Sequence, residues 1–245
     1  MRTKWLFMLA IIGLTHISPA TVIAAPTQAD DKLSINKARI DTALKQMVTD
    51  GRAAGTSALI WKDGREVYFG TSGEADREAK RPMRRDTIIQ IFSMTKPVTG
   101  VALMQLWEQG KFGLDDPIAT YLPEFANMQT SAGTDANGVV RYRAASRQIT
   151  IRDVMRHTAG FANSGAETPA HVAYTKADPS ALDHDLAEMG RRLATVPLLY
   201  DPGERWYYGI APDVQALLIE KISGQPYAAY VKQHIFDPLG MKDTA

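Results

Sequence analysis

The segment from Thr87 to Gly100 constrains the fold of this chain more than any other. Its first part, up to Phe92, is an apolar run that predicts a strand, and its second part has the apolar spacing of a core helix ending near Gly110. Ser93 lies where that helix begins, and Lys96 follows three residues later. Residues at i and i+3 share one helix face, with Cβ atoms about 5–6 Å apart, so the Lys96 amine can reach the Ser93 hydroxyl.

A serine and a lysine in this arrangement can form a nucleophile. If burial or a neighbouring cation lowers the pKa of Lys96, its neutral amine can take the serine proton. A helix N-terminus favours developing negative charge, and Pro97 is tolerated in a first turn. The spacing alone is not specific, because Ser34 and Lys37 repeat it. There, Ser34 is better interpreted as the N-cap of a helix that runs to Thr49.

Composition excludes several classes of site. With 245 residues, 45% of them hydrophobic and 22% charged, the chain is long enough for a globular core. A net charge of +1 gives no indication of a nucleic-acid partner. The absence of cysteine excludes disulfides, thiolate nucleophiles and cysteine-bound metals. The histidines lack metal-ligand spacing and there is no glycine-rich phosphate loop, so we expect neither a metal nor another cofactor.

The N-terminus has the plan of a signal peptide. Arg2 and Lys4 precede an apolar run from Trp5 to Leu14, and small residues follow around Ala24. An uncleaved anchor is the alternative, but the apolar run is short for a membrane span. We therefore expect a signal peptide over residues 1–24 and a mature chain over 25–245. That chain would be periplasmic or secreted, with no stable membrane anchor after cleavage.

The mature chain divides into an N-terminal strand region and a helical remainder. Thr56–Lys62 and Arg65–Gly70 flank Asp63-Gly64, which predicts a hairpin. The polar, glycine-containing stretch 127–147 predicts a loop. Capping residues and breakers then predict helices that start at Thr150, span Ser180–Leu193, run from Pro212 to Gly224, and span Tyr227–Phe236. After the first three strands we expect mainly helix and loop.

Five segments in one order carry a family resemblance: Ser93–Thr99, Leu114–Pro117, Arg156–Gly160, Pro202–Tyr208 and Ile222–Pro226. With them the chain resembles the serine β-lactamase-related family, which includes class C β-lactamases, D-Ala-D-Ala carboxypeptidases and family VIII esterases. The resemblance implies an α+β fold, with an antiparallel sheet flanked by helices plus a helical domain. It also implies three catalytic residues: Ser93 as the acylated nucleophile, Lys96 as its base, and Tyr208 as a partner in proton transfer.

Other residues near these motifs allow alternative assignments of the catalytic and substrate-contacting residues. The distance from Pro202-Gly203 favours Tyr208 over Tyr207, which would pack as an aromatic side chain. Ile210 replaces an asparagine of the family and offers no amide to a substrate, which favours esters over β-lactams. A serine–histidine triad would use His157 with Asp153 or Asp213. The resemblance implies instead that the turn containing His157 is structural.

The family's third motif, a Lys-Thr-Gly, His-x-Gly or Trp-Gly-Gly strand, is not found before Ala245. We therefore expect a chain truncated at its C-terminus, without the last strands of the sheet, inactive by itself and with exposed apolar surface. For the intact protein we predict a serine hydrolase acting on a small-molecule ester. The alternatives are β-lactamase or D-Ala-D-Ala carboxypeptidase activity on a β-lactam or peptide, and a non-catalytic relative that binds peptidoglycan or another ligand.

Overall fold

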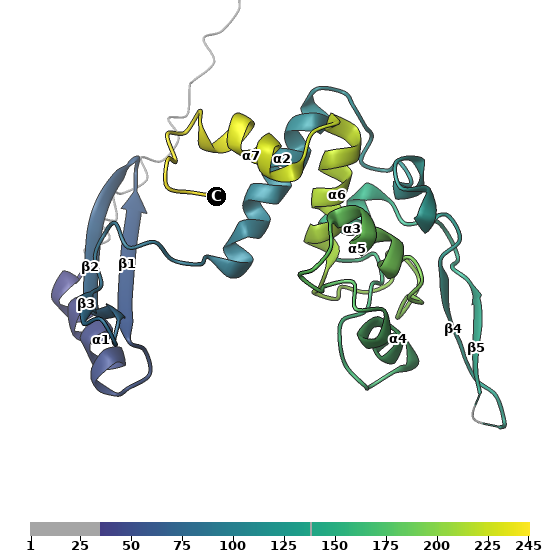
Figure 1. The fold of residues 1–245 in the computed structure, drawn as a ribbon, viewed down its shortest axis with the longest axis horizontal. Coiled ribbons are helices and arrows are strands. Elements are labelled where there is room, and N and C mark those ends of the chain that lie inside the picture. The colour runs from purple at the N-terminus through teal and green to yellow at the C-terminus, as the bar shows by residue number, and fades with distance from the viewer. Residues whose placement is uncertain (1–34, 138) are drawn as a thin grey trace, which may run out of the picture. The chain divides into compact units, whose positions relative to one another are not determined.

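A computed structural model describes residues 35–137 and 139–245 of the chain (Figure 1). Contacts divide the chain into two compact units, the first ending at Thr87 and the second beginning at Ile88. The expected signal peptide over residues 1–24 and the expected N-cap Ser34 lie outside the described residues. In the part of the chain that the structure describes, no helix has both the length and the apolar character needed to cross a membrane.

The first unit is a three-stranded antiparallel sheet with one helix packed on it. Its elements are α1 (Lys37–Thr49), β1 (Gly55–Lys62), β2 (Arg65–Asp76) and β3 (Arg81–Pro82), with strand order β1-β2-β3. The predicted hairpin is confirmed, and Asp63 and Gly64 at its turn both have positive φ. Asn36 caps α1 by accepting a hydrogen bond from the Arg39 N–H. Tyr68 on β2 is buried and donates to Asp41 on α1 at 2.6 Å, which ties the helix to the sheet.

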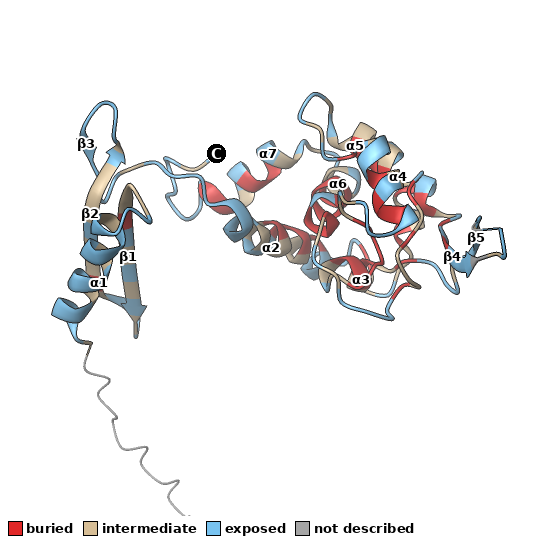
Figure 2. Ribbon diagram, turned by 90° about the horizontal axis from the view of Figure 1, so that it is seen from below, coloured by how far each residue is buried: buried red, intermediate tan, exposed pale blue. Residues whose placement is uncertain are grey.

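The second unit is mainly helical and contains the larger core. Its helices are α2 (Thr95–Glu108), α3 (Ile151–Met155), α4 (Pro169–Ala177), α5 (Leu186–Leu193), α6 (Ala211–Ser223) and α7 (Tyr227–Val231), the last continued by a π-helical turn over Lys232–Phe236. Helix α6 packs against α2, α3, α5 and α7 and is buried along most of its length (Figure 2). The predicted helices that end at Gly224 and Phe236 are confirmed, as is the cap of α3 by Thr150 and Asp153.

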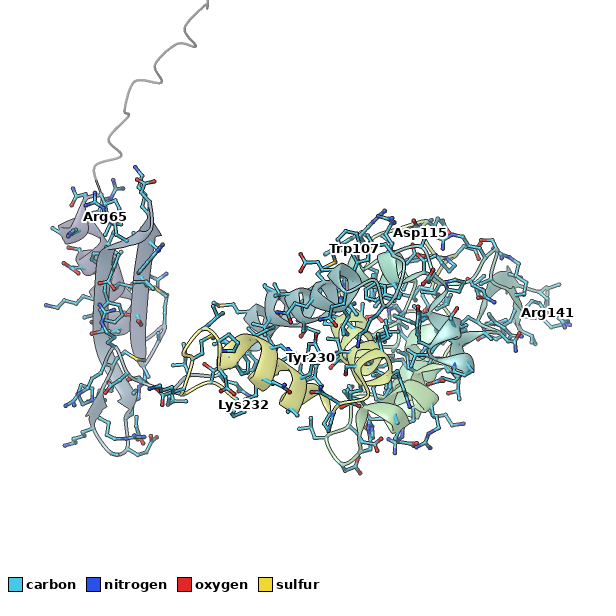
Figure 3. All side chains as sticks on the ribbon, turned by 90° about the horizontal axis from the view of Figure 1, so that it is seen from above. Arg65, Trp107, Asp115, Arg141, Tyr230 and Lys232 are labelled. Atoms are coloured by element: carbon cyan, nitrogen blue, oxygen red, sulfur yellow. The ribbon has the colours of Figure 1, made fainter. Side chains whose placement is uncertain are left out.

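Three sequence predictions in this unit were wrong. Residues 127–147 are not a loop, because β4 (Gln129–Thr134) and β5 (Val140–Ala144) form an antiparallel ribbon. The strands are polar and largely exposed, so the apolar alternation that marks a half-buried strand is missing. At one end of the ribbon the Leu198 N–H donates to the Gln129 carbonyl. Near the other end, Arg141, which is labelled in Figure 3, pairs with Asp135.

The strand predicted over residues 87–92 is absent. This backbone is irregular, and the side chains of Ile88 and Ile89 are exposed.

The third error is the start of the helix predicted from Ser180, because α5 begins only after its N-cap Asp185. A separate helix, α4, precedes it and ends at Asp178, which has a left-handed conformation. Exposed apolar side chains, as expected, occur around the start of α2 and on its outer face: Ile88, Ile89, Phe92, Met94 and Val101.

Candidate active site

The entrance to α2 presents Ser93 to solvent. A short 3₁₀ helix over Phe92–Met94 precedes α2, and Ser93 is its middle residue. Phe92 has φ of +47°, a left-handed conformation that is unfavourable for an aromatic residue. This sharp change of direction, followed at once by helix, exposes the Ser93 side chain at the N-terminal end of α2.

The three residues predicted to be catalytic meet at this point. Lys96 Nζ donates a hydrogen bond to Ser93 Oγ at 3.1 Å, and Ser93 Oγ lies 2.6 Å from Tyr208 Oη. Lys96 Nζ also lies 4.8 Å from the centroid of the Tyr208 ring. The serine oxygen therefore has a cationic donor on one side and a phenol on the other, and proton transfer between the three groups needs no large movement.

Electrostatics lower the pKa of Tyr208. Hydrogen bonding to Lys96 is the largest cause that lowers the pKa of the phenol, followed by hydrogen bonding to Ser93, while partial desolvation opposes both. The charge of Lys96 adds a further lowering. At any given pH near neutrality, Tyr208 therefore has a larger phenolate fraction than an ordinary tyrosine.

Aromatic packing separates the two adjacent tyrosines. The Tyr208 ring stacks on His157, with centroids 5.0 Å apart and an interplanar angle of 26°, and Trp206 lies 6.2 Å away. Tyr207 points elsewhere: its hydroxyl is 2.9 Å from His171 Nε2, and its ring meets Tyr200 edge-on. The structure thus brings Tyr208, and not Tyr207, to Ser93.

His157 does not form a triad with Ser93. No hydrogen bond joins the two within the described ranges, and His157 Nδ1 is buried without a partner. Burial, and after it the charge of Lys96, lowers the pKa of His157. The Asp153 carboxylate is bonded to Arg147, Thr150 and Thr158 instead of to histidine. The alternative of a serine–histidine–aspartate triad through Asp153 is therefore wrong.

Arg147 and Asp153 form a network behind the site, in which the carboxylate is buried and the guanidinium is partly exposed. The guanidinium makes two hydrogen bonds to the carboxylate, at 2.6 and 2.9 Å, and Asp153 is only 4% exposed. Gly203 passes close by with φ of +87°, and a Cβ atom there would lie 2.3 Å from Arg147 Nη2. The Gly203 N–H also donates to the Thr158 carbonyl at 2.7 Å. The network therefore fixes the turn that leads into Tyr208.

Sequence reasoning missed Arg147, His171 and Asn163 as residues around the site. The spacing of Thr150 and Asp153 indicated the cap, but no local pattern marks an arginine as the partner of Asp153.

The role predicted for Ile210 from the sequence needs a correction. This residue is 6% exposed and belongs to the hydrophobic core, so its side chain packs inward and gives no basis for choosing between ester and β-lactam substrates.

Over residues 35–137 and 139–245, no group of three or more His, Asp or Glu side chains is arranged to hold a metal ion.

The chain belongs to the Beta-lactamase family, whose sequence model matches residues 40–245. It is 35% identical over 210 residues to esterase EstB of Burkholderia gladioli, an alignment covering 84% of this chain and 50% of that protein. It is 29% identical over 238 residues to the putative penicillin-binding protein PbpX of Bacillus subtilis, covering 91% of this chain and 52% of that protein.

A solved structure gives the same result. EstCE1, described as a hydrolase with promiscuous acyltransferase activity, is 34% identical and superimposes with a TM-score of 0.68. The match covers 83% of this chain and 51% of EstCE1. The chain thus spans about half the length of the curated relatives it matches.

Proposed function

We propose that this protein is a serine hydrolase that cleaves carboxylic esters through an acyl-serine intermediate. The observation that carries the proposal is the position of Ser93 Oγ, 3.1 Å from Lys96 Nζ and 2.6 Å from Tyr208 Oη. In this proposal Ser93 is the nucleophile, Lys96 and Tyr208 together accept its proton, and no metal or other cofactor takes part.

The reaction would proceed in two balanced steps. Ser93 Oγ bonds to the ester carbonyl carbon while its proton passes to the Lys96–Tyr208 pair. The carbon–oxygen bond to the alcohol then breaks, and the pair returns the proton to the departing alkoxide. In the second step water attacks the acyl-serine, its proton follows the same route to Ser93 Oγ, and the carboxylic acid leaves.

The similarity to EstB supports an ester as substrate. EstB is named as an esterase, and it is 35% identical to this chain over 210 residues. A small-molecule ester is therefore the proposed substrate class.

Covalent labelling tests the nucleophile. The protein encoded by the complete reading frame, with any residues that follow Ala245, is treated with a fluorophosphonate and digested for mass spectrometry. We expect one adduct, on Ser93, and none in the Ser93→Ala variant. An adduct on another residue, or no labelling by any serine-directed probe, would overturn the proposal.

A β-lactam or peptide substrate is the second candidate, because the chain aligns with PbpX over 91% of its length. Turnover of p-nitrophenyl butyrate compared with that of a chromogenic cephalosporin separates the two. We expect faster ester hydrolysis. Cephalosporin turnover well above ester turnover would reverse the order. Stoichiometric cephalosporin binding without acylation of Ser93 would favour a non-catalytic binding protein.

We also propose that the protein is exported, on the basis of the signal-peptide plan of its first 24 residues. Cell fractionation and N-terminal sequencing test this. A mature protein that begins at Ala25 in the periplasm or medium is expected, and an intact Met1 in the cytoplasm would contradict it.

A further inference from the structure

We infer that the loop from His157 to Asn163 is a clamp that positions the Tyr208 phenol against Ser93, with His157 holding the ring and Asn163 holding the backbone. The inference rests on the proposed function, because the position of the phenol matters for the rate only if Ser93 is acylated. It assigns both residues positioning roles, since neither is hydrogen-bonded to Ser93 or Lys96 within the described residues.

Tyr208 needs such a clamp because its own surroundings restrain it weakly. The residue is 42% exposed, and it precedes the first turn of α6 instead of lying within a helix or strand. Its ring is held by stacking on His157, at 5.0 Å between centroids, and the two rings share Trp206 as a neighbour. Removing the imidazole would leave one face of the phenol without a contact and free the ring to rotate away from Ser93.

The backbone around Tyr208 is bonded to the same loop at two points. Asn163 Nδ2 donates to the Tyr208 carbonyl at 2.8 Å, and the Tyr207 N–H donates to the His157 carbonyl at 2.8 Å. Gly209 makes the first bond possible, because a Cβ atom there would lie 2.2 Å from Asn163 Oδ1. The loop thus holds the backbone at the Tyr207 N–H and at the Tyr208 carbonyl, before and after the Tyr208 side chain.

The identity of residue 157 is not explained by the turn alone. His157 has φ of +57°, a left-handed conformation that asparagine adopts more readily, and its Nδ1 is buried without a partner. Asparagine at this position would therefore make the turn as well or better. What histidine adds is a flat ring against Tyr208, and burial next to Lys96 favours the uncharged form of that ring.

This contrast gives a crossed experiment. His157→Phe keeps a ring but strains the turn, whereas His157→Asn suits the turn but removes the ring. The second-order rate constant for fluorophosphonate labelling of Ser93 is measured for both in the full protein, with melting temperatures recorded by circular dichroism. We expect His157→Phe to label within about threefold of the parent and His157→Asn to label at least about tenfold more slowly, since small misplacements of catalytic groups cost this much or more.

The backbone anchor is tested separately. Asn163→Ala removes the donor to the Tyr208 carbonyl, and we expect labelling to slow by about tenfold. Ser164→Ala is the matched control, because Ser164 is the next residue, is exposed, and makes no hydrogen bond to Tyr208 within the described residues. It should label like the parent. Asn163 is partly exposed, so its variant is expected to fold even if a His157 variant does not.

The outcomes separate the clamp from a purely structural turn and from the proposed function. If His157→Asn labels as fast as His157→Phe or faster, or if Asn163→Ala labels like Ser164→Ala, the clamp is overturned. If the parent protein is not labelled on Ser93, the proposed function fails instead. The clamp is then tested by the NMR shifts of the Tyr208 ring, which should change in His157→Asn more than in His157→Phe and stay unchanged if the clamp is wrong.

Discussion

Tyr208 Oη lies 2.6 Å from Ser93 Oγ, although 115 residues separate the two along the chain. The packing of two helices explains this contact. Ser93 immediately precedes α2 and Tyr208 shortly precedes α6, and these helices pack against each other in the core. Leu103 and Leu106 of α2 and Leu217 of α6 are fully buried there. The contact between the serine and the phenol therefore depends on the same burial that stabilises the unit.

The first prediction distinguishes the two adjacent tyrosines. Tyr208→Phe removes the hydroxyl next to Ser93 and should slow acylation of Ser93 by about 10²–10⁴-fold, the usual contribution of a general acid–base group. Tyr207→Phe is the control, because that hydroxyl faces His171 and should change the rate little. Stopped-flow measurement of phosphonate labelling checks both. Equal losses in the two variants would show that the Tyr208 hydroxyl has no special part in the reaction.

Local signals in the sequence were enough for much of this fold. The Asp63-Gly64 turn, the cap formed by Thr150 and Asp153, and the left-handed Gly224 each act within a few residues, and each prediction is confirmed. The ribbon formed by β4 and β5 was missed because its side chains are mostly polar and exposed, so it has no apolar pattern. The run over residues 87–92 gave the opposite error, since apolar side chains alone do not make a strand.

The residues of the site also differ in whether the sequence could predict them. Helix geometry predicted that Lys96 would reach Ser93, because both lie within one turn. Tyr208 could be placed near them only through the family resemblance, since no short-range pattern brings it there. Three further residues could not be predicted, because their side-chain contacts exist only in the folded chain. Asn163 bonds to Tyr208, 45 residues away, and His171 to Tyr207, 36 residues away. Arg147 bonds to Asp153, six residues away.

The second prediction concerns the ionisation of Tyr208. Lys96→Met removes the largest cause of its lowered pKa, so the pKa of the phenol should rise toward its ordinary value of 10.0. Phenolate would then form only at higher pH than in the parent. Because the chain has nine tyrosines, the titration is read as the difference in tyrosinate absorption between each protein and its Tyr208→Phe counterpart. Lys111→Met serves as the control and should leave the titration of Tyr208 unchanged.

The third prediction concerns the network behind the site. Burial alone would raise the pKa of Asp153, but hydrogen bonds from Arg147 and Thr150 outweigh it and lower the pKa below 3.8. A carboxyl whose pKa is lowered on folding stabilises the protein above its unfolded pKa, and this stability is lost as the pH falls through the folded value. Stability should therefore fall below about pH 4, and less steeply in Asp153→Asn.

Substitution of the arginine should have the larger effect at neutral pH. Arg147→Met leaves a buried carboxylate without its cation and should lower the free energy of unfolding by about 3 kcal/mol, the lower end for broken buried pairs. Asp153→Asn should cost less, because the Arg147 side chain is 43% exposed and can be hydrated. Urea denaturation measures both. Arg141→Met, which breaks the exposed pair with Asp135, is the control and should cost under about 1 kcal/mol.

The last prediction concerns Ile210, the position where the family has an asparagine. If this residue faced the substrate, Ile210→Asn would add an amide to the site and improve activity on β-lactams. The structure places the side chain in the core at the start of α6, with 6% exposure, so the amide would be buried instead. Burying an amide without hydrogen-bond partners costs about 1–3 kcal/mol, in addition to the lost apolar packing. We therefore expect Ile210→Asn to lower stability by at least about 2 kcal/mol without a gain in cephalosporin turnover.

Ile210→Val, which stays apolar, is the control and should lower stability by only about 1 kcal/mol. Urea denaturation and a cephalosporin assay on both variants decide, and a stable Ile210→Asn protein with increased cephalosporin turnover would show that residue 210 contacts the substrate after all.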